Sequence, residues 1–141
     1  MPHSSFKTTV RVTWVDTDAS GVVHFSRFFV YFERTEEEFY RSLRLSFTDL
    51  RNKGLWLPRV EAFCQYKKPA RFEDMLEVEL TPEQLKEESA KLGFTVTNKE
   101  TAELLTTGYF VVVAADKNTG KATQIPKEFA DKLKPFTKQI L

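Results

Sequence analysis

The stretch FSRFFVYFERTEEEFYRSL, residues Phe25 to Leu43, decides the fold because it predicts one long helix with a strongly apolar face. Apolar side chains recur in it at the three- and four-residue spacing of a helix face. They are Phe25, Phe28, Phe29, Phe32, Phe39, Tyr40 and Leu43. We therefore predict a helix from about Ser26 to Leu43, with Ser26 as its N-cap.

The charged residues of this stretch predict the opposite side of the helix. The group consists of five of the seven charged residues of the stretch: Arg34, Glu36, Glu37, Glu38 and Arg41. Glu36 interrupts the apolar pattern midway, and the simplest interpretation places it with the others on a charged outer face. A helix with one apolar side needs a surface to cover, so the rest of the chain should supply a sheet.

Strand-like segments occur on both sides of this helix. Residues Phe6 to Val15 alternate with the period of two expected of a strand, with Thr8, Val10, Val12 and Trp14 on one side. The runs after the helix are Leu55 to Lys67, Met75 to Leu85, Lys91 to Thr97 and Leu104 to Ala115. Short connections between them favour antiparallel pairing. We predict an α+β fold in which an antiparallel sheet of about five strands wraps around the long helix.

Two shorter helices complete the predicted elements. Ser46 to Asn52 reads as one short helix, which Lys53 and Gly54 end. Ile125 to Lys134 reads as a closing helix with Pro126 in its first turn.

Length and charge limit the class of protein. A chain of 141 residues is long enough for one domain with a substantial core, so residues 1–141 are predicted to form a single domain. The net charge is +1 and the basic residues are scattered, which argues against a nucleic-acid partner. The longest apolar run, Tyr109 to Ala115, is far shorter than the ~20 residues that span a membrane. The N-terminus does not resemble a signal peptide, so we expect a cytoplasmic protein without membrane insertion.

The stretch DTDASGVVHF, residues Asp16 to Phe25, places two carboxylates just before the long helix. Asp is common in turns and ahead of helices because it satisfies free backbone N–H groups. A carboxylate in this position can also act as a base or a nucleophile. A metal site is disfavoured, because two carboxylates alone are a poor ligand set and the sequence shows no further acidic or His partner at suitable spacing.

Two blocks of the chain resemble a known family. DTDASGVVHF followed by the long helix is similar to the hotdog-fold acyl-CoA thioesterases of the 4-hydroxybenzoyl-CoA thioesterase and YbgC-like groups. In these, a strand leads to an Asp-x-Asp-x-x-Gly-[Val/Ile]-Val loop and then to the central helix. The loop residues match Asp16, Asp18, Gly21, Val22 and Val23. The block KKPARFEDMLEV, residues 67–78, resembles a turn and strand of the same family, and the likeness spans nearly the whole chain.

The resemblance implies an enzyme that hydrolyses an acyl-CoA thioester to the free acid and CoA. It assigns the catalytic carboxylate to Asp18, as nucleophile or general base. It assigns the oxyanion hole to a backbone N–H at the start of the helix, that of Phe25 or its neighbour His24. Asp16 is then expected to be a structural turn residue. His24-Phe25 replaces the Tyr-His common in YbgC-like members, which bears on acyl specificity, and Thr35-Glu36 replaces a common Ala-Arg pair.

This chemistry suits the order of residues in the loop. Thioester hydrolysis needs a base or nucleophile near the carbonyl carbon and donors near the oxygen that becomes negative. The first N–H groups of a helix have no intrahelical acceptor and carry a partial positive charge, so they can be those donors. Gly21 would let the backbone approach the thioester closely, with Val22 and Val23 beside it.

Other residues are candidates for substrate contact. Lys91 matches the family's channel for the pantetheine arm of CoA, and Arg59 and Arg71 are further candidates for contacts with CoA. Because Lys and Arg side chains are mostly exposed, a solvated surface position is the favoured interpretation of all three. His24 could polarise the substrate, contact water or CoA, or simply pack. Cys64, the only cysteine, reads as a small apolar residue, and a Cys64-His24-Asp arrangement is the alternative nucleophile.

The family builds its active sites between two subunits, so the resemblance implies a homodimer or a homotetramer made of two dimers. It implies acyl-CoA as the binding partner and neither a metal nor a cofactor. The alternatives are a non-catalytic hotdog module that binds acyl-CoA, and a thioesterase that acts on acyl carrier protein.

Overall fold

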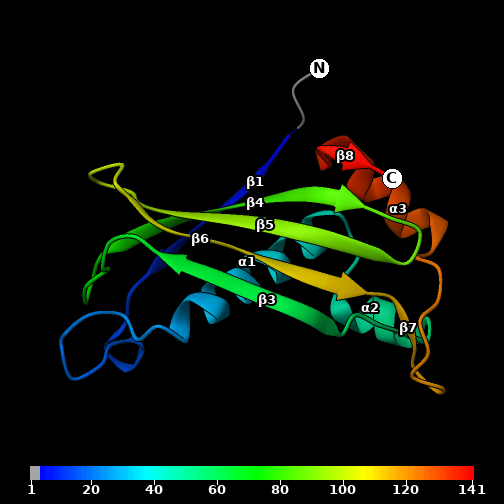
Figure 1. The fold of residues 1–141 in the computed structure, drawn as a ribbon, viewed down its shortest axis with the longest axis horizontal. Helices are drawn as coiled ribbons and strands as arrows, with labels where there is room; N and C mark the ends of the chain where they lie inside the picture. Colours follow the sequence, from blue (N-terminus) through cyan, green and yellow to red (C-terminus); the bar gives the residue numbers. More distant parts are fainter. Residues whose placement is uncertain (1–3) are drawn as a thin grey trace.

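The computed structural model describes residues 4–141 and consists of an antiparallel sheet packed against helix α1 (Arg27–Ser42) (Figure 1). The main strands are β1 (Phe6–Arg11), β3 (Arg59–Tyr66), β4 (Met75–Leu85), β5 (Ser89–Asn98) and β6 (Leu104–Val113). Their order across the sheet is β1-β4-β5-β6-β3, so β1 and β3 lie at the two edges. This confirms the predicted α+β architecture, in which a sheet wraps around one long helix.

Helix α1 forms because its apolar side chains share the face that meets the sheet. Phe32 is fully buried, and its ring stacks on Phe94 of β5 with centroids 4.5 Å apart. Gly108 on β6 makes this close approach possible. A Cβ atom there would lie 2.3 Å from the Phe63 carbonyl oxygen and 2.6 Å from the Phe32 ring. The packing of Phe32 against the sheet therefore depends on the missing side chain at Gly108.

The predicted boundaries of α1 are confirmed to within one residue, and Ser26 stands at the N-cap position as predicted. Its side chain makes no capping hydrogen bond, because its hydroxyl bonds to the His24 side chain instead. The prediction for Glu36 is wrong. Glu36 is fully buried and does not lie on the outer face. Its carboxylate is buried because Arg59 of β3 and Tyr40 of α1 supply polar partners inside the fold.

The first predicted strand is too long. It ends at Arg11, and residues Trp14–Asp16 form a 3-10 turn, η1. The Trp14 side chain is 82% exposed and does not face the core. The alternation breaks because Thr13 donates its backbone N–H to the Asp16 side chain, which bends the chain before the strand period can continue.

The remaining short elements largely follow the sequence pattern. Helix α2 (Phe47–Asn52) is capped by Ser46, and Gly54 follows it in a left-handed conformation with φ of +80°. The predicted strand from Leu55 divides into β2 (Leu55–Trp56) and β3, and β2 pairs with β7 (Ala115–Asp116). Pro126 stands immediately before α3 (Lys127–Leu133) rather than within its first turn, and η2 (Lys134–Phe136) follows α3.

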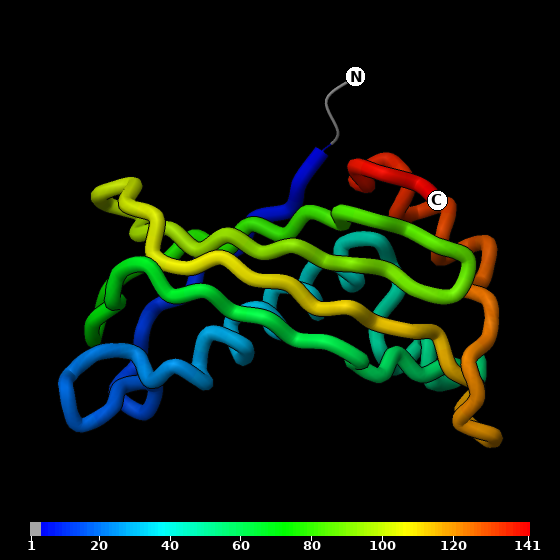
Figure 2. Tube along the Cα trace, in the orientation of Figure 1, coloured from blue at the N-terminus to red at the C-terminus, as the bar shows by residue number. Residues whose placement is uncertain are grey.

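The short strand β8 (Gln139–Ile140) was not predicted, and it pairs in parallel with the end of β4. The two ends of the molecule are well separated along its long axis. The loop before α1 lies at one end, and α2 with β7 lies at the other (Figure 2). No helix in residues 4–141 is long and apolar enough to cross a membrane.

Candidate active site

The loop of residues 17–26 is a tight turn closed by its own backbone. Thr17 and Val23 form an antiparallel bridge, and the Asp18 N–H donates to the Val22 carbonyl over 2.9 Å. Gly21 has φ of +80°, and its N–H donates to the Asp18 carbonyl over 3.0 Å. The Asp18 side chain is half-buried, and its Oδ1 accepts the Ser20 N–H over 2.8 Å. The turn therefore holds Asp18 in a defined place while leaving its second oxygen to other partners.

This loop packs against the second block of the sequence. The Val23 N–H donates to the Ala70 carbonyl over 2.8 Å, and Val22 forms a bridge with Arg71. The Arg71 side chain is exposed. The structure thus brings Val22 and Val23 together with Arg71, one of the predicted substrate-binding residues.

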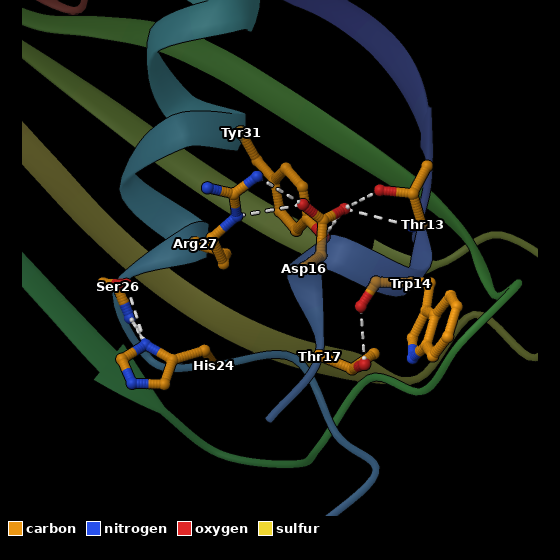
Figure 3. A network of polar contacts seen from close by, with 8 residues as sticks. All are labelled: Thr13, Trp14, Asp16, Thr17, His24, Ser26, Arg27 and Tyr31. Atoms are coloured by element: carbon orange, nitrogen blue, oxygen red, sulfur yellow. Dashed lines mark hydrogen bonds and ion pairs between the residues drawn. The ribbon is translucent and has the colours of Figure 1, made fainter. Parts of the chain in front are cut away.

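Unlike Asp18, Asp16 is buried and lies in a network of polar contacts, which Figure 3 shows. It is only 1% exposed. Its Oδ2 accepts the Thr13 N–H over 3.0 Å, the Thr13 hydroxyl over 3.0 Å and the Tyr31 hydroxyl over 2.9 Å. Its Oδ1 lies 2.9 Å from both Nε and Nη2 of Arg27. Asp16 therefore makes the structural contacts predicted for it.

These contacts keep Asp16 ionised. Burial alone raises the pKa of the carboxyl group, but the donors from Thr13, Arg27 and Tyr31 outweigh it, so the pKa lies below its ordinary value. A carboxylate enclosed in this way has no free face for a substrate.

The residues between the loop and α1 carry the candidate oxyanion donor. The His24 N–H donates to the Asp16 carbonyl over 2.8 Å, and the His24 carbonyl accepts the Arg27 N–H over 2.9 Å. The Tyr66 hydroxyl of β3 donates to the Phe25 carbonyl over 2.7 Å. Within residues 4–141, the Phe25 N–H donates to no protein acceptor. This N–H is thus held in place on both sides and available to a ligand.

The His24 side chain is oriented by the residue that follows Phe25. Its Nδ1 accepts the Ser26 N–H over 3.2 Å and lies 2.8 Å from the Ser26 hydroxyl (Figure 3). Because Nδ1 accepts a hydrogen bond, the neutral ring carries its proton on Nε2. The ring stacks on Phe25 with centroids 4.3 Å apart. His24 can therefore offer one N–H donor beside the loop.

Two predicted substrate residues are not brought to this loop within one chain. Arg59 lies at the start of β3, at the opposite end of the molecule, where it pairs with Glu36. Lys91 lies near the start of β5, with its Nζ 3.7 Å from Glu83 and 4.2 Å from the Tyr109 ring centroid. Their assignment to substrate binding stays a prediction.

Cys64 is half-buried on β3, and burial raises the pKa of its thiol. A raised pKa lowers the fraction of reactive thiolate, so the environment does not favour the alternative nucleophile. In the part of the chain that the structure describes, no group of three His, Cys, Asp or Glu residues could hold a metal ion.

Four residues around the loop carry no prediction from the sequence: Thr13, Arg27, Tyr31 and Tyr66. One signal was present. Arg27 is the first residue of α1, where a positive charge opposes the helix dipole, and Tyr31 lies four residues later on the same face. An unfavourable charge at a helix N-terminus indicates an acidic partner nearby. No comparable signal marks Tyr66, which approaches Phe25 only through the fold.

A groove of about 380 Å³ lies at the end of the molecule opposite the Asp18 loop. Most of its lining side chains are apolar: Phe47, Leu50, Leu55, Trp56, Leu57 and Pro58. A single chain therefore keeps its reactive groups and this apolar groove apart.

Comparisons with known proteins agree with this architecture. The sequence model of the thioesterase-like superfamily matches residues 12–133. The chain is 36% identical over 124 residues to a protein of Aquifex aeolicus whose name assigns it provisionally to the esterases, covering 88% of this chain and 94% of that protein. It is 29% identical over 134 residues to the acyl-CoA thioester hydrolase YbgC of Escherichia coli, covering 95% and 99% of the two chains.

Among solved structures, a 1,4-dihydroxy-2-naphthoyl-CoA thioesterase from Synechocystis matches with a TM-score of 0.87 and 26% identity. The match covers 92% of this chain and 96% of that one. The predicted family resemblance and the predicted hotdog fold are both confirmed.

Proposed function

Because the chain belongs to the thioesterase-like superfamily, we propose that it hydrolyses an acyl-CoA thioester to the free acid and CoA. The names of its Escherichia coli and Synechocystis relatives support this reaction. The observation that carries the proposal is the pairing, in one short loop, of the half-buried Asp18 with the available Phe25 N–H at the start of α1.

Asp18 supplies the reactive oxygen in either of two ways. As a nucleophile, its carboxylate bonds to the thioester carbon, CoA leaves as a thiolate, and water then hydrolyses the mixed anhydride. As a general base, it takes a proton from water, the resulting hydroxide adds to the same carbon, and the proton passes to the departing sulfur. Both routes need an Asp18 oxygen that is not already bonded, and only Oδ1 is engaged with Ser20.

The Phe25 N–H stabilises the negative oxygen that forms in either route. It stands two residues before Arg27, the first residue of a sixteen-residue helix, and so lies close to the partial positive charge of the helix N-terminus. One such donor is typically worth about 3 kcal/mol of transition-state stabilisation. His24 adds a second donor through Nε2. We expect His24→Tyr to change the relative rates among acyl groups more than it changes folding, as measured over a panel of acyl-CoA substrates.

Substrate binding involves the walls of the same loop. Gly21 allows close approach of the backbone, and the partly exposed Val22 forms the adjacent surface, with the buried Val23 packed behind it. We propose that Arg71 contacts the CoA phosphates, and its exposure beside Val22 supports this role.

A complete site requires a second chain. Lys91, Arg59 and the apolar groove lie away from the loop of the same chain, so only another subunit can bring such groups to it. The edge of the sheet at β3 gives a surface for this pairing. We therefore propose a homodimer or a homotetramer, and light scattering at micromolar concentration is the check. A fully active monomer would contradict the shared site.

The decisive experiment compares Asp18→Asn with the wild-type chain. The amide is a very poor base and nucleophile, so kcat should fall by at least ~100-fold while KM changes far less. Thiol release from an acyl-CoA panel is the measurement, with circular dichroism to show folding. Asp131→Asn, an exposed carboxylate on α3, is the control and should keep normal activity.

Two outcomes would contradict the proposal. A folded Asp18→Asn variant with near-normal kcat would remove Asp18 from the mechanism. A wild-type chain that binds acyl-CoA but releases no thiol would indicate the non-catalytic binding module. Turnover with acyl carrier protein substrates alone would change the substrate and not the reaction.

A further inference from the structure

We propose that Asp16, Arg27 and Tyr31 form a positioning unit that sets the place of the Phe25 N–H relative to Asp18. We call this unit, together with Thr13, the Asp16 clamp (Figure 3). The inference rests on the proposed function, and it gives the first carboxylate of the Asp-x-Asp pair a task in catalysis that does not involve touching the substrate.

The clamp holds both ends of the reactive loop at one residue. The Asp16 carbonyl accepts the His24 N–H over 2.8 Å, and the Asp16 carboxylate binds Arg27 at 2.9 Å and Tyr31 at 2.9 Å. Asp18 is two residues beyond Asp16, and Phe25 directly follows His24. The contacts of Asp16 therefore restrain both the reactive carboxylate of Asp18 and the oxyanion donor of Phe25.

The clamp is also attached to the sheet. Thr13 donates its backbone N–H and its hydroxyl to Asp16. The preceding residue, Val12, is fully buried and donates its N–H to the Asp74 carbonyl over 2.9 Å. A loop fixed to a rigid element keeps its reactive groups within the narrow tolerance that catalysis needs.

Charge gives the clamp a second effect. An isolated carboxylate beside the oxyanion donor would repel the negative charge that forms in the transition state. Arg27 neutralises Asp16 through two contacts of 2.9 Å, so the field of the helix N-terminus is preserved. This explains why α1 begins with a basic residue and has no acidic residue in its first turn.

The test uses two variants of the clamp and one matched control. Tyr31→Phe removes one hydroxyl from Asp16, and we expect kcat to fall about 5- to 10-fold with KM within twofold, because one positioning contact is lost. Asp16→Asn should lower kcat about 30- to 100-fold, since the amide cannot satisfy Thr13 and Arg27 together. Tyr40→Phe removes a matched buried hydroxyl from the carboxylate of Glu36 on the same helix, and its kcat should stay within twofold.

A second readout separates positioning from stability. Amide hydrogen exchange of a peptide covering residues 17–26 should be faster in Tyr31→Phe than in the wild type, and unchanged in Tyr40→Phe. Tyr31→Phe and Asp16→Asn variants that melt at lower temperature, yet keep normal kcat and normal exchange in this peptide, would overturn the inference.

The two proposals fail differently. If Asp18→Asn is inactive while Tyr31→Phe and Asp16→Asn both turn over normally, only the clamp is wrong. If the wild-type chain hydrolyses no thioester, the proposed function falls and the catalytic role of the clamp falls with it. The exchange comparison then still decides whether Asp16 orders the loop.

Discussion

Helix α1 covers two buried carboxylates, Asp16 near its start and Glu36 in its middle, and their protonation differs although their partners look alike. Each acid is paired with one Arg and one Tyr: Arg27 and Tyr31 for Asp16, Arg59 and Tyr40 for Glu36. The pKa of Asp16 is lowered, whereas that of Glu36 is raised to about 7.

The difference has two causes, the depth of burial and the number of donors. Burial dominates at Glu36, which lies deeper in the protein, where Arg59 and Tyr40 only partly oppose it and the charge of Glu33 adds to it. Asp16 also receives a backbone N–H and a hydroxyl from Thr13, and all its donors together outweigh its burial. Deeper burial at Glu36 and additional donors at Asp16 therefore separate the two pKa values.

The largest expected difference between the two carboxylates is the change in the free energy of unfolding when each is replaced by an amide. At pH 8, Asp16→Asn should lower the free energy of unfolding by about 3 kcal/mol, because a buried pair loses one partner. Glu36→Gln should change it by less than about 1 kcal/mol, because its charge is already disfavoured and Arg59 reaches solvent. Urea unfolding followed by circular dichroism, at one fixed chain concentration, measures both. Equal losses in the two variants would contradict the difference between the two carboxylates.

A smaller effect is expected in the pH dependence of stability, which Glu36 should cause. The folded-state pKa of Glu36 is about 7, against an ordinary value of 4.5, so the folded chain binds more protons than the unfolded chain between these values. The stability that protonated Glu36 contributes is thus complete below about pH 4.5 and lost as pH rises towards 7. The loss should be on the order of 1 to 3 kcal/mol.

Thermal melts of the wild type and of Glu36→Gln between pH 5 and 8 test this. The Gln variant should show a flatter profile. Asp16 does not interfere, because its lowered pKa places its effect below the ordinary value of 3.8, where stability is lost as pH falls. Parallel profiles would show that Glu36 is ionised throughout.

The smallest effect distinguishes the two tyrosines. Tyr31→Phe and Tyr40→Phe each remove one hydrogen bond to a buried carboxylate and should each lower stability by about 1 kcal/mol. Only Tyr40→Phe should move the pH transition upwards, because the lost hydroxyl favours charged Glu36. A transition that moves equally in both variants would mean that the two acids are coupled.

The sequence predicts the parts of the fold whose pattern is long and local. Helix α1 and strand β4 lie where periodicity places them, since each repeats one spacing over many residues. Trp14 was misplaced because Thr-Trp-Val prolongs the strand pattern, whereas a side-chain contact from Asp16 decides the turn. The burial of Glu36 and the pairing of β8 depend on partners far away in the sequence, which no local pattern contains.

The candidate site also contains residues that the sequence predicts and residues that only the tertiary structure brings together. Asp18, Gly21 and the helix start could be assigned because they stand in one recognisable order. The clamp could not, although Arg27 at the helix start was a visible sign. Its meaning requires knowing that Arg27 and Asp16 meet across the loop.

The positions of the two tryptophans make intrinsic fluorescence sensitive to contacts at the two ends of the molecule. Trp14 is 82% exposed beside the reactive loop, and Trp56 is 49% exposed in the groove at the far end. An indole as exposed as that of Trp14 changes its emission little when a lone chain unfolds, and the half-exposed indole of Trp56 changes its emission only in part. Covering either end with a second chain or a ligand shifts that emission to shorter wavelength, and Trp14→Phe or Trp56→Phe leaves one end visible at a time. Fluorescence of this chain therefore reports what touches its two ends better than it reports folding.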